Sequence, residues 1–330
     1  MRGIASLGLA LALALAAPAF AAPTVITGVW GPEDLERVPG TPLVIVSQYY
    51  ATRDNVKGDL ALLDTTTDKV QPLPIRAAFE KDWGDPSCLA PPSHIGPHGI
   101  HLARRADGRL QLLVVNHQER ESIELLEVDK GGRLLTWHGC VPSTEAFNDV
   151  AALPGGGFIA TVPTAHGQPE KVDGTEAGFL MEWHPGQALR RLPGSEAAFN
   201  NGVQVSPDGK TVYFDAWTTS EIVRYDRASA RITGRVKAGF MPDNLSVAAD
   251  GTYIAVGIDK LIGRQCVMLE KQCSSSFTAA RFDPRTMTVT PLYRGAAGEM
   301  AGASIGLQVG SDLYLGSFTG ARILKVPMPR

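Results

Sequence analysis

The fold is decided by one stretch, Phe199-Asn200-Asn201-Gly202-Val203-Gln204-Val205-Ser206-Pro207-Asp208-Gly209-Lys210-Thr211-Val212-Tyr213-Phe214. Two β-rich runs flank its Asp-Gly pair, and this arrangement predicts a β-hairpin. Residues 147–161 and 241–256 have the same form, and 303–316 is a degenerate copy. Asn148, Asn201 and Asn244 begin three of these units, at spacings of 53 and 43 residues. The chain is therefore interpreted as a series of repeated hairpins.

Repeats of roughly this length, built from short strands, are typical of propeller blades. Residues 22–330 divided by about 50 residues per blade give six blades. Helical periodicity is hard to find in the sequence. We therefore predict an all-β, six-bladed β-propeller with four-stranded blades around a central tunnel, forming a single domain over residues 22–330.

The first residues are interpreted as an export signal. Met1-Arg2 is positive, an apolar Leu/Ala-rich run follows, and Ala19-Phe20-Ala21 has the form of a cleavage site. A signal peptide over 1–21 predicts a secreted or periplasmic protein with no membrane anchoring after cleavage. The net charge of −3, without a basic block, argues against a nucleic-acid partner.

Four cysteines in an exported chain predict two disulfides. Cys266 and Cys273 lie close in the sequence and are expected to pair locally. Cys88 and Cys140 would then close a long loop. This is one of three pairings that four cysteines allow.

Asparagine and aspartate recur at the strand starts of the repeats, as Asn148-Asp149, Asn201 and Asp243-Asn244. The innermost strands of a propeller line its tunnel, so equivalent positions converge on the axis. Oxygen ligands without thiolates suit a hard cation, and calcium is expected in an exported protein. The same residue types are also ordinary turn formers, but their shared register favours ligands.

A further acidic pair, Glu33-Asp34, lies in the stretch 30–36, which we interpret as a turn carrying three acids. Neighbouring side chains on a strand point to opposite faces. Adjacent ligands such as Asn148 and Asp149 are therefore expected to serve two ions at different depths. The tunnel is predicted to bind calcium.

Two histidines end neighbouring elements. His98 lies in Gly96-Pro97-His98-Gly99-Ile100, a tight turn into a strand, and His117 closes the apolar run 110–117. If they meet, one imidazole can fix the tautomer of the other, as a base and its orienter. On the spacing alone, two unrelated surface histidines are the more common arrangement.

These motifs resemble the paraoxonase/arylesterase family of six-bladed propellers, which is related to the SMP-30/gluconolactonase group. The resemblance spans residues 32 to about 320 and is most specific at Glu33-Asp34 and at the two histidine runs. It implies hydrolysis of lactones and aryl esters with two calcium ions. The implied ligands of the catalytic ion are Glu33, Asn148, Asn201, Asp243 and Asn244. Those of a structural ion are Asp34, Asp149 and the backbone carbonyl of Ile100.

In the implied mechanism, calcium polarises the carbonyl of a small lactone or ester, and the dyad His98 and His117 activates water. Glu33 or Asp243 is an alternative base. A second hypothesis is a sugar lactonase of the gluconolactonase type, without a functional histidine dyad. A third hypothesis is a calcium-stabilised propeller that binds partners and catalyses nothing.

The chain departs from the vertebrate members of that family. Without cysteines near the two termini, ring closure is expected to rest on strand pairing or on other disulfides. The segment 163–176 is polar and Gly-rich where those members carry a membrane-docking segment, so no lipid attachment is expected. The residues after Gly257 also differ, so the identity of the substrate is left open. The sequence gives no indication of the oligomeric state.

Overall fold

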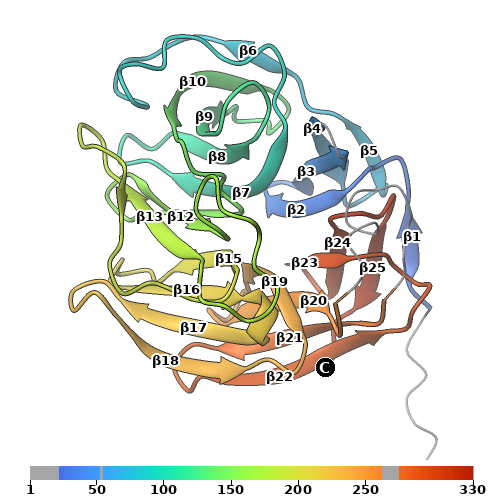
Figure 1. Ribbon diagram of the computed structural model, residues 1–330. Coiled ribbons are helices and arrows are strands. Elements are labelled where there is room, and N and C mark those ends of the chain that lie inside the picture. The colour runs from blue at the N-terminus through green and yellow to red at the C-terminus, as the bar shows by residue number, and fades with distance from the viewer. Residues whose placement is uncertain (1–21, 53–54, 262–274, 330) are drawn as a thin grey trace, which may run out of the picture.

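The computed structural model describes residues 22–52, 55–261 and 275–329. Six small sheets are arranged around a common axis, which confirms the six-bladed propeller (Figure 1). The expected signal peptide 1–21 and the expected Cys266–Cys273 pair lie outside the described residues. No helix in the described ranges is long and apolar enough to cross a membrane.

In every blade the first three strands follow one another outward from the axis in order of sequence. The innermost strands are β2 (Pro32–Arg37), β7 (Pro97–Arg104), β11 (Val150–Ala152), β15 (Asn200–Val205), β19 (Met241–Val247) and β23 (Ala303–Val309). The second strands are β3 (Leu43–Thr52), β8 (Leu110–Asn116), β12 (Phe158–Val162), β16 (Thr211–Ala216), β20 (Tyr253–Ile258) and β24 (Asp312–Ser317). The third strands are β4 (Asn55–Asp64), β9 (Ser122–Val128), β13 (Phe179–Trp183), β17 (Glu221–Asp226), β21 (Phe277–Asp283) and β25 (Ile323–Pro327).

The fourth, outer strands are β5 (Lys69–Pro72), β10 (Leu135–Pro142), β14 (Arg190–Arg191), β18 (Arg231–Lys237), β22 (Thr288–Gly295) and β1 (Thr24–Ile26). Blade 2 departs from the four-stranded prediction, because β6 (Ile75–Ala77) adds a fifth strand parallel to β10. The chain leaving blade 1 runs along the outer edge of blade 2 before it enters β7, and this path gives the edge a partner. A single 3-10 turn, η1 (Trp217–Thr219), follows β16.

Strand pairing closes the ring. This confirms one of the two means of closure expected from the sequence, which were strand pairing and other disulfides. The N-terminal strand β1 pairs antiparallel with β25, with Ile26 opposite Ile323, and so completes the last blade (Figure 1). The Cys88–Cys140 disulfide is also formed, with Cα atoms 5.6 Å apart. It ties the segment after β6 to the outer strand β10 and confirms that predicted pair.

The core lies between the blades. Ile45 and Leu62 of blade 1 pack against Leu112 of blade 2, whereas Val44 and Val46 face Ile305 of blade 6. Alternate residues of one strand thus enter two different interfaces. Both faces of each second strand are buried, which explains why these strands are continuous apolar runs instead of alternating ones.

The prediction of an acidic turn at residues 30–36 is wrong, because residues 32–37 form the innermost strand β2. Acidic residues have low strand propensity. In this protein the acidic residues line the axis of the propeller. The backbone of β2 still pairs with β3, on one side only, so the segment remains a strand of the sheet. The position in the ring overrides the local preference.

Candidate functional site

Irregularities in the innermost strands orient the candidate residues. The β2–β3 register shifts between Pro32 and Asp34, and the β7–β8 register shifts between Pro97 and Ile100. Equivalent shifts occur at the starts of β15, β19 and β23. A β-bulge re-aims side chains locally. Glu33, His98, Asn201 and Asp243 therefore lie at bulges, a feature that simple strand alternation does not predict.

A cavity of about 470 Å³ opens at the first residues of these strands. Five of the residues singled out in the sequence line it together: His98, His117, Asn148, Asn201 and Asp243. Glu33 and Asn244 are buried next to this group, since Asn244 Nδ2 donates to Glu33 Oε1 at 2.5 Å and His98 Nε2 lies 3.9 Å from the same oxygen. Residues far apart in the sequence thus meet at one end of the tunnel.

Four buried oxygens at this end have no hydrogen-bond partner among the described residues. They are Glu33 Oε2, Asn148 Oδ1, Asn201 Oδ1 and Asn244 Oδ1. A buried polar atom without a partner costs about 1–3 kcal/mol. Four such oxygens from four different blades therefore point to a missing partner that attracts oxygen lone pairs. A hard cation fits this donor set.

The acids of the group repel one another in a buried place. Burial raises the pKa of Asp243 to about 8 and also raises the pKa of Glu33, to which the charges of Asp34, Asp243 and Asp149 contribute further. A bound cation opposes both effects. No cluster of three or more His, Cys, Asp or Glu side chains with metal-binding geometry is found in the described part of the chain. The candidate set instead combines two carboxylates with three amides.

A second cavity of about 290 Å³ lies further along the same strands, and Asp34, Ile100 and Asp149 line it. Asp34 accepts hydrogen bonds from the backbone N–H groups of Leu35 and Ile100, both at 2.7 Å. Asp149 likewise accepts from Val150 and Val203 at 2.7 Å. Each carboxylate therefore links its own blade to another one. The two carboxylates predicted for the second ion therefore have hydrogen-bond partners within the protein, unlike the four oxygens of the first site.

The two histidines meet. His98 Nδ1 and His117 Nε2 are 3.0 Å apart, and the ring of Tyr49 stacks on His98 with centroids 4.2 Å apart. Burial, and then the neighbouring His117, hold the pKa of His98 well below its usual range. His98 is therefore neutral near pH 7, as a general base must be.

A third group, Glu121, was missed in the sequence. Its Oε2 lies 2.7 Å from His117 Nδ1, on the side of that ring away from His98. Glu121 lies in the turn between β8 and β9, four residues after His117. An acid in a polar turn carries no distinguishing sequence signal, so only the structure shows this contact.

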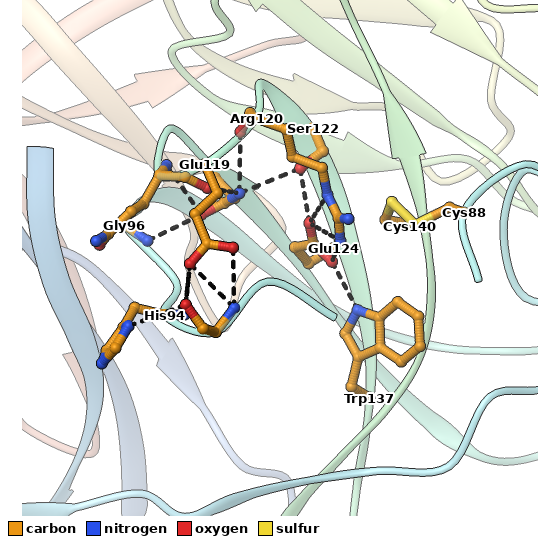
Figure 2. A network of polar contacts seen from close by, with 12 residues as sticks. Cys88, His94, Gly96, Glu119, Arg120, Ser122, Glu124, Trp137 and Cys140 are labelled. Carbon is orange, nitrogen blue, oxygen red and sulfur yellow. Dashed lines mark hydrogen bonds and ion pairs between the residues drawn. A yellow bond between two sulfur atoms is a disulfide. The ribbon is translucent and has the colours of Figure 1, made fainter. Parts of the chain in front are cut away.

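A buried network holds the turn that carries His117 and Glu121. The Asn116 side chain accepts from Gly96 N and donates to Arg120 O and to Ser122 Oγ. Glu124 is fully buried below it. The Glu124 carboxylate accepts from Arg120, from Ser122 Oγ at 2.7 Å and from Trp137 Nε1 at 2.6 Å. These contacts are drawn in Figure 2. The turn that carries His117 and Glu121 is therefore held by buried hydrogen bonds to the strands beside it.

Aromatic side chains form the upper walls of the first cavity. Phe147, Phe199, Trp217 and Phe318 line it, and the Phe199 and Trp217 ring centroids are 5.2 Å apart. The polar segment 163–168, together with Glu170, closes one side. The cavity thus combines an apolar wall with a polar floor, the usual character of a small-molecule site.

Fold and site together define a six-bladed propeller with a small-molecule cavity at the end of its tunnel. A sequence model of the SMP-30/Gluconolactonase/LRE-like region matches residues 86–260. The chain belongs to this family.

Curated relatives match part of the chain. Human serum paraoxonase/arylesterase 1 is 27% identical over 179 residues, which cover 50% of this chain and 49% of the human protein. The mouse protein of the same name is 29% identical over 169 residues, or 47% and 46% of the two chains. The dihydro-heme d1 dehydrogenase of Pseudomonas aeruginosa is 36% identical over 74 residues, which are 22% of this chain and 14% of that protein. The chain thus spans half or less of the length of these relatives.

Solved structures share the whole fold. A luciferin-regenerating enzyme aligns with a TM-score of 0.56 and 13% identity over 93% of this chain and 95% of that one. A putative gluconolactonase aligns with a TM-score of 0.54 and 16% identity over 94% and 93%. Regucalcin from Agrobacterium tumefaciens, described as a calcium-binding protein, aligns with a TM-score of 0.52 and 14% identity over 94% of each chain. At these identities the likeness establishes the fold.

Proposed function

We propose that this protein is a calcium-dependent hydrolase of lactones and aryl esters. The observation that carries the proposal is the set of four unpartnered buried oxygens, from Glu33, Asn148, Asn201 and Asn244, next to a histidine pair in one cavity. The names of the paraoxonase relatives and of the family support the same class of substrate.

Glu33, Asn148, Asn201, Asp243 and Asn244 would hold the ion. When bound, calcium supplies Lewis acidity toward a carbonyl oxygen and stabilises the oxyanion that forms from it. His98 accepts a proton from the attacking water, because its ring is neutral and close to the ligand group. His117 holds the orientation of His98. The second ion, at Asp34, Asp149 and Ile100, remains a prediction, and backbone N–H groups already donate to both of its carboxylates.

The cavity walls favour apolar substrates. Phe147, Phe199, Trp217 and Phe318 offer aromatic surface to an aryl or alkyl group. A sugar lactone would present several hydroxyl groups to the same walls, and each loses hydrogen bonds to water there. The family name nevertheless keeps a sugar lactonase as the second candidate.

A substrate panel with and without a chelator tests the proposal. The purified protein is assayed on aryl esters, alkyl-substituted lactones and a sugar lactone, first with calcium, then with EGTA, then with calcium restored. We expect hydrolysis of the apolar substrates that is lost with EGTA and regained with calcium. Hydrolysis of the sugar lactone alone would favour the second candidate. Calcium binding without any hydrolysis would favour a binding propeller.

We also propose that the protein is exported. The Cys88–Cys140 disulfide supports this, because disulfides persist mainly in oxidising compartments. Fractionation of the source cells, with mass analysis of the N-terminus, tests the cleavage after residue 21.

A further inference from the structure

His117 lies between two partners. Its Nε2 is 3.0 Å from His98 Nδ1, and its Nδ1 is 2.7 Å from the Glu121 carboxylate. The Glu121 side chain is 30% exposed, whereas His117 is 9% exposed. The three groups therefore form a continuous chain from the solvent edge to the buried floor of the cavity.

We infer that Glu121 is a positioning residue that fixes the tautomers of both histidines. A carboxylate only accepts hydrogen bonds, so His117 Nδ1 must carry the proton. In a neutral ring the other nitrogen, Nε2, is then an acceptor, and His98 Nδ1 must donate to it. His98 Nε2 is left with its lone pair free.

The free nitrogen is the one that faces the ligand group, since His98 Nε2 lies 3.9 Å from Glu33 Oε1. Glu121 thus selects which atom of His98 accepts a proton. The catalytic consequence rests on the proposed hydrolase function, but the tautomer order depends only on the geometry.

Glu121 is held in place by its surroundings. Its backbone oxygen accepts from Ser143 N at 2.9 Å, and the next residue, Ser122, is buried at the start of β9. Exposed ion pairs contribute little to the stability of a protein. The contact between Glu121 and His117 is therefore better explained by its effect on the orientation and tautomer of the imidazole ring. Glu119 in the same turn serves as a contrast, because its carboxylate accepts from Ser93 and His94 (Figure 2), whereas the carboxylate next to His117 Nδ1 is that of Glu121.

Histidine tautomers are read directly by NMR. In protein labelled with ¹⁵N-histidine, long-range ¹H–¹⁵N correlations distinguish a protonated Nδ1 from a protonated Nε2, and the His98→Gln and His117→Gln variants assign the signals. We expect His117 to be protonated at Nδ1 in the wild type. In Glu121→Gln the side-chain amide can donate as well as accept a hydrogen bond, so the Nε2–H tautomer of His117 should appear. Glu119→Gln should leave the signals of His98 and His117 unchanged.

Kinetics provide the second measurement. We expect Glu121→Ala to lower kcat about 10–100-fold, part of the 10²–10⁴-fold that a general base contributes, with KM within about twofold. Added formate or acetate should restore part of kcat, because the partly exposed site leaves room for a carboxylate. Glu119→Ala should behave like the wild type with or without formate.

Two results would overturn the inference. One is a wild-type His117 protonated at Nε2, or a spectrum that Glu121→Gln does not alter. The other is an active Glu121→Ala variant with wild-type kcat. A wild-type protein that hydrolyses nothing would defeat the proposed function, while the NMR measurement would still decide the tautomer order.

Discussion

At the scale of single residues, three asparagine amides distinguish the first cavity from an ordinary polar pocket. The Oδ1 atoms of Asn148, Asn201 and Asn244 are buried and lack a donor among the described residues. Asp34 and Asp149, only one position from candidate ligands, have their oxygens satisfied by backbone N–H groups. Residues that are neighbours in the sequence thus have different roles. The asparagine oxygens are available to a cation, whereas Asp34 and Asp149 join blades through backbone hydrogen bonds.

The histidine pair leads to the first prediction. His98→Gln should lower the rate of lactone and ester hydrolysis by about 10²–10⁴-fold, and His117→Gln by less, because the second imidazole only orients the first. Calcium binding should survive in both, since neither ring is assigned as a ligand. Steady-state kinetics and calcium titration check this, with the exposed His94→Gln as the control. Wild-type rates in both variants would leave catalysis to the ion and its carboxylates.

The second prediction concerns the metal-free protein. Burial raises the pKa of Asp34 to about 7 and that of Asp243 to about 8, so the folded state keeps protons that the unfolded chain has lost near pH 4. The free energy of unfolding should therefore fall as pH rises from about 6.5 to 8. The lowered pKa of His101, about 4, acts only below pH 6.5, where unfolded imidazoles take up protons.

Denaturant titrations at pH 6.5, 7.2 and 8.0, with metal removed, measure this slope. The Asp243→Asn variant should flatten it, because its side chain has no proton to lose. Added calcium should stabilise the wild type more at pH 8 than at pH 6.5, since the ligands bind it deprotonated. A metal-free protein that gains stability over this window would contradict the prediction.

At the scale of elements, close approach of the innermost strands depends on glycine. A Cβ built on Gly202 of β15 would lie 2.4 Å from the Asp243 backbone oxygen and 2.5 Å from Asn244 Cα in the neighbouring blade. Gly99 of β7 meets Asp149 in the same way. The glycine that follows a candidate residue thus lets two blades bring their ligands together.

The third prediction follows from this contact. Gly202→Ala should lower the free energy of unfolding by about 1–3 kcal/mol, because backbone atoms cannot move aside as a side chain can. Gly234→Ala on the outer strand β18 is the matched control. Its Cβ would lie 3.4 Å from the flexible side chains of Arg224 and Met287, and we expect a change within about 0.5 kcal/mol. Equal effects in the two variants would show that the contact between inner strands is unimportant.

At the scale of the whole molecule, one short strand closes the ring. β1 supplies the outer strand of the last blade, and Ile26 packs into the cluster between blades 1 and 6. Without β1 the edge of β25 would present unpaired backbone groups, a template for association.

The fourth prediction is that deletion of residues 22–27 lowers the thermal midpoint and promotes self-association. A synthetic peptide of residues 22–29, added in excess, should restore part of the midpoint. Ile26→Ala should be destabilising by about 2–5 kcal/mol, whereas Val25→Ala, at a position that is 49% exposed, serves as the control. Calorimetry and size-exclusion chromatography check both effects. An unchanged midpoint after the deletion would mean that closure depends on other contacts.

Much of the blade structure was predictable, because hairpin periodicity and Asp-Gly turns are local. The repeats at Asn148, Asn201 and Asn244 predicted the number of blades and placed the candidate ligands at strand starts, and the apolar runs predicted the buried second strands. The pattern was misleading at residues 32–37, where three acids indicated a turn and β2 was found. It also gave no sign of β6, whose pairing depends on the path of a long connection.

Sequence alone therefore set the blade repeat, the class of fold and the residue types of the site, since these depend on neighbours along the chain. The tertiary structure decided which of those residues share a cavity, which carboxylates are already satisfied, and that Glu121 contacts His117. The physical reason is ring closure. Distances across the axis depend on bulges and on the contacts of all six blades at once, and no local pattern encodes them.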